Sequence, residues 1–202
     1  MSSNSPISRR QPRGRPPRTT HAEVGRAALE LFARDGFEET TLEDIAEAVG
    51  IGRRTLFRYF PSKNDMVWGD FDWVLDRLRR SLDAVDPTEP VMEGLARAVI
   101  ASNRYEPDQQ PELRVRLTLI TTVPALQAHS MVRYAAWRAV VGEYIARRLG
   151  AEPDDLVPLT IGHMALGTSM AAFVRWVNHP AEDLETHLEH GYRLLAQVAR
   201  LD

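Results

Sequence analysis

Hydrophobic residues recur at helical spacing along most of the chain, in segments separated by glycine, proline and short polar runs. The first segment runs from Thr20 to Arg34, and Glu23 follows Thr20 by three residues, which is the spacing of a capping box. No segment of useful length alternates polar and apolar residues as a half-buried strand does. We therefore predict an all-α fold. Further helices are expected at about 63–85, 88–105, 111–121, 124–149, 155–178 and 181–200.

Two short helices joined by a tight turn are predicted between Phe37 and Asp65. Thr41 and Asp44 have capping-box spacing ahead of an apolar stripe, and Gly50 can take the left-handed conformation that ends a helix. A second helix follows almost at once and ends before a proline. This arrangement is typical of a helix-turn-helix, whose second helix enters the major groove of DNA.

The second helix, at residues 53–60, has two different faces. Leu56, Phe57 and Phe60 have the spacing expected of residues that anchor the helix to the protein. The other face is polar and mostly basic, and consists of Arg53, Arg54, Thr55, Arg58 and Tyr59. The first three of these stand at the helix start, where an arginine can donate to O6 and N7 of guanine. The alternative is that the arginines are only a solvated face.

Three further residues are better placed for phosphate than for bases. Thr41 and Lys63 stand at expected helix starts, because Ser62 and Asp65 form another capping box, and a helix N-terminus attracts phosphate. Tyr59 lies near the end of the second helix. Contacts of this kind set register and salt dependence rather than sequence preference.

Charge is distributed unevenly along the 202 residues. The first 63 residues carry 11 Lys and Arg against 8 Asp and Glu, a net charge of +3, whereas the rest carry 14 against 20, a net charge of −6. This asymmetry favours an N-terminal end that faces DNA and an acidic body. The chain has no cysteine for a disulfide or zinc site, no signal-peptide pattern and no run of transmembrane length, so we expect a cytoplasmic protein without membrane contact.

A basic arm is expected at residues 1–18, which carry five arginines, four prolines and no acidic residue. This composition predicts disorder in the absence of DNA. Its centre, from Pro12 through Arg13 and Arg15 to Pro16, resembles an AT-hook. The two arginines could lie in a narrow A·T-rich minor groove, where the negative potential is enhanced. The alternative is a solubilising tail.

The residues from Thr40 to Ile51 and from Thr55 to Lys63 resemble the TetR family of transcriptional regulators. The longer strings RGRPPRTTHAEV and GIGRRTLFRYFPSKNDMVWGDFD resemble one subgroup, the regulators associated with mycofactocin biosynthesis. The resemblance implies a homodimer that binds a palindromic operator, commonly as a repressor, and that responds to a small molecule. Gly52, Arg54 and Phe57 depart from the usual family pattern, so the operator sequence cannot be taken from relatives.

An effector pocket among the middle helices is implied by the same resemblance, and the subgroup implies a long-chain acyl-CoA as effector. An apolar tunnel with arginines at its mouth would suit an acyl chain and the phosphates of coenzyme A. The alternative for aromatic residues at helical spacing is an ordinary core. The principal candidate lining residues are Trp68, Phe71, Tyr105, Arg116, Ile120, Tyr134, Trp137, Arg138, His163 and Phe173. The wider set of candidates also includes Trp73, Asn103, Arg104, Leu117, His129, Arg133, Val141, Met164, Met170, Arg175 and Trp176.

The last two helices are the expected dimer interface. Small residues are frequent between Leu156 and Val177, and small residues let helices approach closely. Pairing across a two-fold axis would form a four-helix bundle. The alternative is an intramolecular core.

Two rival functions remain open. An enzyme would need the cluster of His179, His187, Glu189 and His190 as a metal site, but these are more easily explained as exposed helix residues, and we expect no metal and no cofactor. An architectural DNA-binding protein would use the basic arm without effector control. The expected organisation is a basic arm at 1–18, a three-helix helix-turn-helix domain at 19–64, and a ligand-binding and dimerisation domain at 65–202.

Overall fold

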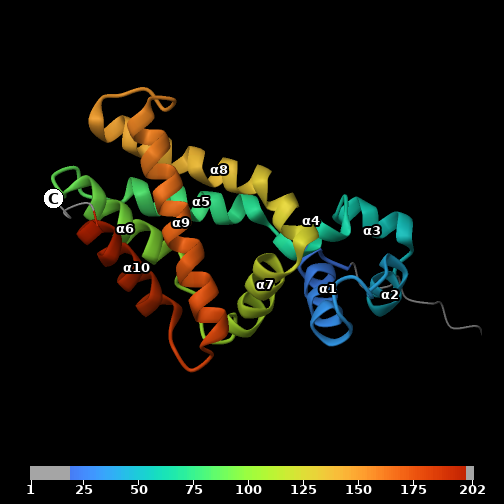
Figure 1. Ribbon diagram of the computed structural model, residues 1–202. Coiled ribbons are helices and arrows are strands. Elements are labelled where there is room, and N and C mark those ends of the chain that lie inside the picture. The colour runs from blue at the N-terminus through green and yellow to red at the C-terminus, as the bar shows by residue number, and fades with distance from the viewer. Residues whose placement is uncertain (1–18, 199–202) are drawn as a thin grey trace, which may run out of the picture.

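The computed structural model describes residues 19–198, which form ten helices and no strand (Figure 1). The helices α1 to α3 lie at one end of an elongated molecule, and α6 and α10 lie at the other (Figure 1). The all-α prediction is confirmed. The helices are α1 (His21–Asp35), α2 (Leu42–Ala48), α3 (Arg53–Tyr59), α4 (Lys63–Trp68), α5 (Phe71–Asp83), α6 (Val91–Ser102), α7 (Gln110–Thr122), α8 (Pro124–Leu149), α9 (Leu156–Asn178) and α10 (Leu184–Val198).

Local signals in the sequence begin and end several helices. The Thr20 hydroxyl accepts from the backbone N–H of Glu23, whose carboxylate accepts from the backbone N–H of Thr20, so two of the free N–H groups at the start of α1 are satisfied. Pro124 opens α8 at a position where no helical N–H is needed. Gly150 ends the same helix in the left-handed conformation, at φ 66°.

Two hydrophobic cores hold the helices together. One core lies among the helices α1 to α4, and the other fills the body between α5, α6, α8, α9 and α10. The helices α7 and α8 contribute to both: Leu119 and Leu126 lie in the first core, and Leu117 and Trp137 in the second. The helix-turn-helix is therefore packed directly on the body.

The single helix expected at 63–85 is in fact two helices, so this prediction was wrong. Apolar residues keep their helical spacing across the segment, but Gly69 turns the chain at φ 61° and ψ −139°. Only glycine takes this backbone region readily. Asp70 then caps α5 by accepting from the backbone N–H of Trp73, at 3.0 Å.

The helix α4 belongs structurally to the DNA-binding end. Its residues Met66, Val67 and Trp68 are buried in the first core. The domain boundary expected after residue 64 falls inside this helix. The chain changes direction five residues after residue 64, at the glycine between α4 and α5.

The helix α9 is long and apolar enough to cross a membrane by length and composition alone, with a mean hydropathy of 1.4 over 18 residues. The expectation that no run reaches this length was wrong. Core helices of soluble proteins pass the same test, and α9 packs between α8 and α10 (Figure 1). Only 28% of that window is buried, however. The apolar residues left on its surface are Leu156, Val157, Leu159, Met164 and Val174.

Candidate DNA interface and effector cavity

The helix-turn-helix is built as its sequence predicts. The Thr41 hydroxyl accepts from the backbone N–H of Asp44 at 3.1 Å, and the Asp44 carboxylate accepts from the backbone N–H of Thr41 at 2.8 Å. The helix α2 therefore starts at a capping box. Gly50 turns the chain at φ 66°, and α3 begins after Gly52. Leu56, which is fully buried, fastens α3 to the core.

The outward face of α3 differs from the prediction at two aromatic residues. Phe57, expected in the core, is 41% exposed, and the guanidinium of Arg53 lies 5.7 Å from the centre of its ring. Tyr59, expected on the outer face, is half-buried against the first core. Helical spacing alone could not separate the two, because both neighbour Leu56 and Phe60 on the helical wheel.

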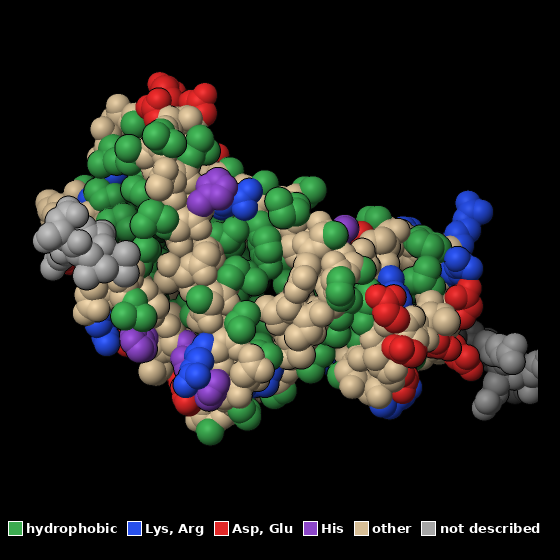
Figure 2. Space-filling model, in the orientation of Figure 1, with side chains coloured by type: hydrophobic (Ala, Val, Ile, Leu, Met, Phe, Trp, Pro, Cys, Tyr) green, Lys and Arg blue, Asp and Glu red, His purple; other side chains and the backbone are tan. Residues whose placement is uncertain are grey.

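The basic side chains of α3 are exposed to solvent. Arg53 and Arg54 are exposed, and Arg53 pairs with Glu43 of α2 at 2.6 Å. Both partners of that pair are well exposed, so the pair contributes little and can yield to another anion. Arg54 has no hydrogen-bond or ion-pair partner in the described part of the chain. Figure 2 shows basic side chains at the α3 end of the molecule, next to acidic side chains over α2.

The three residues expected at phosphate have other contacts in this structure. The hydroxyl of Tyr59 donates to the backbone carbonyl of Thr19, which holds the start of α1 against α3. The Lys63 ammonium donates to the carbonyls of Phe37 at 2.6 Å and Thr40 at 3.1 Å, so it ties the α1–α2 loop to α4. Thr41 is exposed and caps α2. A phosphate contact by these residues stays a prediction. Arg13 and Arg15 lie outside the described residues.

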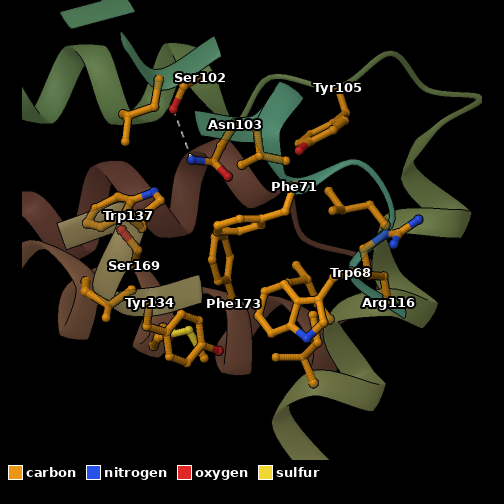
Figure 3. A pocket seen from close by; sticks show the side chains of 17 residues that line it. Trp68, Phe71, Ser102, Asn103, Tyr105, Arg116, Tyr134, Trp137, Ser169 and Phe173 are labelled. Atoms are coloured by element: carbon orange, nitrogen blue, oxygen red, sulfur yellow. Dashed lines mark hydrogen bonds between the residues drawn. The ribbon is translucent and has the colours of Figure 1, made fainter. Parts of the chain in front are cut away.

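A cavity of about 100 Å³ lies between α4, α5, α7, α8 and α9 (Figure 3). Its wall is mainly aromatic and aliphatic, with polar groups from Ser102, Asn103 and Ser169 and one charged side chain, that of Arg116, among the described residues. Figure 3 shows Phe71 and Phe173 at the centre, with Trp137 on one side and Trp68 and Arg116 on the other.

Most of the residues proposed for the effector pocket come together here. Those that line the cavity are Trp68, Phe71, Tyr105, Arg116, Ile120, Tyr134, Trp137 and Phe173.

Arg138 and His163 do not line it. Arg138 lies where α8 crosses α9, with its backbone carbonyl 3.2 Å from where a Cβ would stand on Gly162. His163 is exposed, and its Nδ1 lies 2.8 Å from the carbonyl of Leu159. Their positions follow from the rotation of each helix about its axis, which composition does not reveal.

Six lining residues were missed by the sequence reasoning. Two are serines whose hydroxyls donate to the carbonyl of a preceding turn, which hides them in apolar helices. The others are aliphatic and are typical core residues by every sequence signal. The six are Val74, Leu78, Ser102, Leu113, Leu166 and Ser169.

Two donors in the cavity wall distinguish it from a plain core. The indole Nε1–H of Trp68 is buried and has no hydrogen-bond partner among the described residues. Arg116 donates to the backbone carbonyl of Val67 in α4 and to the carboxylate of Glu112, the latter at 2.7 Å. Burial raises the pKa of the Tyr105 and Tyr134 hydroxyls, so both are neutral donors at neutral pH.

A second polar link joins α4 to α8. Asp65 accepts from Arg133 at 2.7 Å, and Nε2 of His129 lies 3.2 Å from the same carboxylate oxygen. Burial by itself would raise the pKa of Asp65, but hydrogen bonds from Ser62, Arg133 and His129 outweigh it and hold the pKa below its ordinary value. The Arg133 guanidinium also lies 5.5 Å from the ring of Trp68.

The histidine cluster considered for an enzyme is not arranged as a metal site. His187 is buried, and its Nε2 lies 3.1 Å from a carboxylate oxygen of Glu182. His190 is exposed. Across residues 19–198 no three His, Asp or Glu side chains are placed to share an ion.

Family models match both ends of this architecture. Residues 26–67 match the model described as bacterial regulatory proteins, TetR family, and residues 89–200 match the MftR C-terminal domain. The two matched segments correspond to the helix-turn-helix and to the body that encloses most of the cavity.

Individual relatives agree with these matches. The chain is 39% identical over 171 residues to the protein of Mycobacterium tuberculosis named as mycofactocin biosynthesis transcriptional regulator MftR, covering 85% of this chain and 86% of that protein. It is 31% identical over 163 residues to the transcriptional regulator TcmR of Streptomyces glaucescens, covering 75% and 72%.

A solved structure shares the fold. FadR of Thermus thermophilus, a TetR-family repressor solved in complex with lauroyl-CoA, superposes with a TM-score of 0.58 at 24% identity, covering 88% of this chain and 93% of that one. Matches along both segments, a relative at 39% identity and the shared fold lead to one assignment: the chain belongs to the TetR family of transcriptional regulators, which are not enzymes, and its body is a C-terminal domain of the MftR type.

Proposed function

We propose that this chain is a homodimeric repressor that binds a palindromic operator through α3 and is released by an apolar or amphipathic small molecule in the cavity. The observation that supports this most is the position of Trp68. Its side chain belongs to the core of the DNA-binding end and also lines the cavity. A ligand that moves this wall therefore moves α4, on which the helix-turn-helix rests.

Base recognition is assigned to the start of α3. Arg53, Arg54 and Thr55 would enter the major groove, and Arg58 lies one turn further along the same helix. Phosphate contacts are assigned to Thr41, Tyr59 and Lys63. For Lys63 such a contact would add to the loop carbonyls that it already binds.

The basic arm is assigned to the minor groove, through Arg13 and Arg15. In support, the hydroxyl of Tyr59 holds the carbonyl of Thr19, so the first described residue lies beside the DNA-reading helix. An arm that leaves the domain there is close to the duplex that α3 would occupy. Deleting residues 1–18 should weaken binding most at A·T-flanked operators, and unchanged affinity at those sites would remove the assignment.

A long-chain acyl-CoA is the proposed effector class. The related fold of Thermus thermophilus FadR holds lauroyl-CoA, and the cavity here is lined by aromatic and aliphatic side chains. A volume of about 100 Å³ is well below the roughly 300–1,000 Å³ of occupied ligand sites. An acyl chain would therefore have to widen this cavity. Release from DNA requires that the effector bind the DNA-incompetent arrangement more tightly.

A dimer through the last two helices explains the exposed apolar surface of α9. Leu159, Met164 and Val174 lie on that surface together with small residues such as the exposed Gly167, and Leu194 of α10 is also exposed. Exposed apolar patches mark sites of protein–protein contact. A second copy would cover it and would present two α3 helices to two half-sites. Because the proposed dimer binds DNA, we expect it in the cytoplasm.

The test is a gel-shift titration against DNA from upstream of its own gene, at fixed salt and with excess competitor, with and without lauroyl-CoA. Specific binding that lauroyl-CoA releases is the expected result. Specific binding that ignores lauroyl-CoA would keep the repressor and remove the effector class. Binding no tighter than to competitor would favour the architectural alternative.

A further inference from the structure

We infer that Arg116 binds the anionic head group of the effector and couples this binding to α4. When the guanidinium binds the anion, it gives up its hydrogen bond to the backbone carbonyl of Val67. The inference rests on the proposed effector function of the cavity and adds the chemical class of the ligand and the residue that couples it to the DNA-binding end. The ligand is an anionic amphiphile, with an apolar tail in the cavity and a carboxylate or phosphate at Arg116.

Arg116 lies where the head group of a ligand in the cavity would be. Arg116 is the charged residue among the described lining residues, and it stands at the boundary between the cavity and an outer recess of about 230 Å³. The two spaces also share Trp68, Tyr105 and Leu113 as walls. A ligand that enters from the recess and places its tail among Phe71 and Phe173 therefore leaves its head group beside this guanidinium (Figure 3).

The hydrogen bonds of Arg116 connect α7 to α4. One arm of its guanidinium donates to the carbonyl of Val67, at the end of α4, and the other pairs with Glu112 one turn earlier on α7. The first contact crosses from the body to the DNA-binding end. The guanidinium is also close to Gly69, where a Cβ would stand 2.8 Å from Nη1, so the bend between α4 and α5 is shaped around it.

An anionic head group can displace the partners that Arg116 now has. A charged phosphate or carboxylate is a better acceptor for guanidinium than a neutral carbonyl, particularly in a bidentate arrangement. Glu112 is 44% exposed and pairs with Arg116 at i,i+4, a kind of ion pair that contributes little. Asp70 and Glu112 also line the recess, and their negative charges oppose an anion there. The attraction must therefore come from Arg116, which is the positively charged residue of the recess lining among the described residues. The buried Nε1–H of Trp68, which has no described partner, offers a second donor from α4 itself.

The test compares Arg116→Gln with a matched control on the same helix. Arg114 is also half-buried on α7 and donates to a carbonyl at a helix end, that of Trp176 at 2.5 Å, but it does not line the cavity. Arg114→Gln therefore removes the same charge and the same kind of hydrogen bond, together with a contact between the guanidinium and the Trp176 ring, 3.8 Å from its centre. Arg116→Lys is the second variant, because lysine keeps the positive charge but lacks the planar guanidinium that can donate two parallel hydrogen bonds. Thermal unfolding of each variant checks that the fold is kept.

The probes are laurate, lauroyl-CoA and 1-dodecanol, which share a chain length and differ in head group. Binding is followed by tryptophan fluorescence, since Trp68 and Trp137 line the cavity, and operator release by anisotropy of labelled DNA. The wild type should bind at least one anion about tenfold or more tightly than dodecanol, and that anion should weaken operator binding about 5- to 150-fold. Laurate and lauroyl-CoA separate a carboxylate head from a phosphate head.

In Arg116→Gln the preference for an anion over dodecanol should fall to about twofold or less, and the coupling to operator binding should approach one. Arg116→Lys should keep part of the anion preference, and Arg114→Gln should behave as the wild type. The inference is overturned if Arg116→Gln keeps its anion preference and coupling, or if Arg114→Gln loses the same coupling. If no probe affects the wild type, the effector function itself fails and the inference fails with it, a result visible before any variant is made.

Discussion

At the residue scale, function depends on which side of α3 each side chain faces. Arg54 is exposed and has no hydrogen-bond or ion-pair partner within residues 19–198, whereas Arg53 must first leave Glu43. Phe57 is exposed beside Arg53, so in the proposed complex this helix would present an aromatic ring as well as cations to the groove. An apolar group in that position can contact a thymine methyl.

Arg54→Ala should relax base preference at one operator position at a cost of about 1–3 kcal/mol, because a bidentate contact to guanine is lost. Binding to a panel of single-base operator variants measures this. Arg147→Ala is the control, since it removes an equal charge from an exposed site near the end of α8. An equal loss of affinity for every operator variant would contradict the assigned role.

At the element scale, α4 is the piece that connects DNA binding to the body, and two different groups of contacts hold it. Asp65 near its start is bound by Arg133 and His129 of α8, and Val67 near its end is bound by Arg116 of α7. The sequence indicated the cap of this helix but not these partners, because they come from residues 49 to 68 positions away.

Asp65→Asn should lower the free energy of unfolding at pH 7 by about 1–3 kcal/mol, because charged hydrogen bonds are lost. The folded pKa of Asp65 lies below the ordinary value of 3.8, so its stabilisation is present above that value and disappears as the pH falls through the folded pKa. Denaturant unfolding at several pH values should show the two proteins converging in acid. Asp83→Asn is the control, because Asp83 pairs with Arg147 at an exposed site. A difference that persists unchanged in acid would contradict the role of the ionised carboxylate.

Gly69→Ala should destabilise the protein by about 2–3 kcal/mol, since its φ of 61° with ψ of −139° lies in a region essentially restricted to glycine. Gly150→Ala should cost about 1–2 kcal/mol, because Gly150 takes the left-handed helical conformation and no atom lies within 4 Å of the added Cβ. Thermal unfolding compares them. Equal losses in the two variants would show that the bend between α4 and α5 has no special requirement.

At the scale of the whole molecule, the exposed apolar surface of α9 is the proposed dimer interface. Met164→Glu should convert the proposed dimer to monomer, since a charge cannot be buried in an apolar interface without a partner. Operator affinity should fall with it, because one half-site is lost. Sedimentation and anisotropy measure the two effects. Val132→Glu, at an exposed apolar position on α8, is the control. A Met164→Glu protein that stays dimeric would place the interface elsewhere.

Much of this molecule follows from local sequence. The capping residues Thr20 and Thr41, the helix-ending Gly50 and Gly150, and the apolar periodicity of the body were sufficient for an all-α fold with a helix-turn-helix near the N-terminus. Caps and turns depend on neighbours within a few residues, so a sequence shows them directly.

Tertiary structure alone decided the features that depend on how far each helix is rotated and where it is bent. It exposed Phe57 and turned Tyr59 inward, broke the expected long helix at Gly69, and excluded Arg138 and His163 from the cavity. The missed lining residues have the same cause: an apolar or small side chain in a helix becomes part of a core or of a cavity according to what packs against it. That choice is made by contacts between segments distant in sequence, which helical periodicity does not encode.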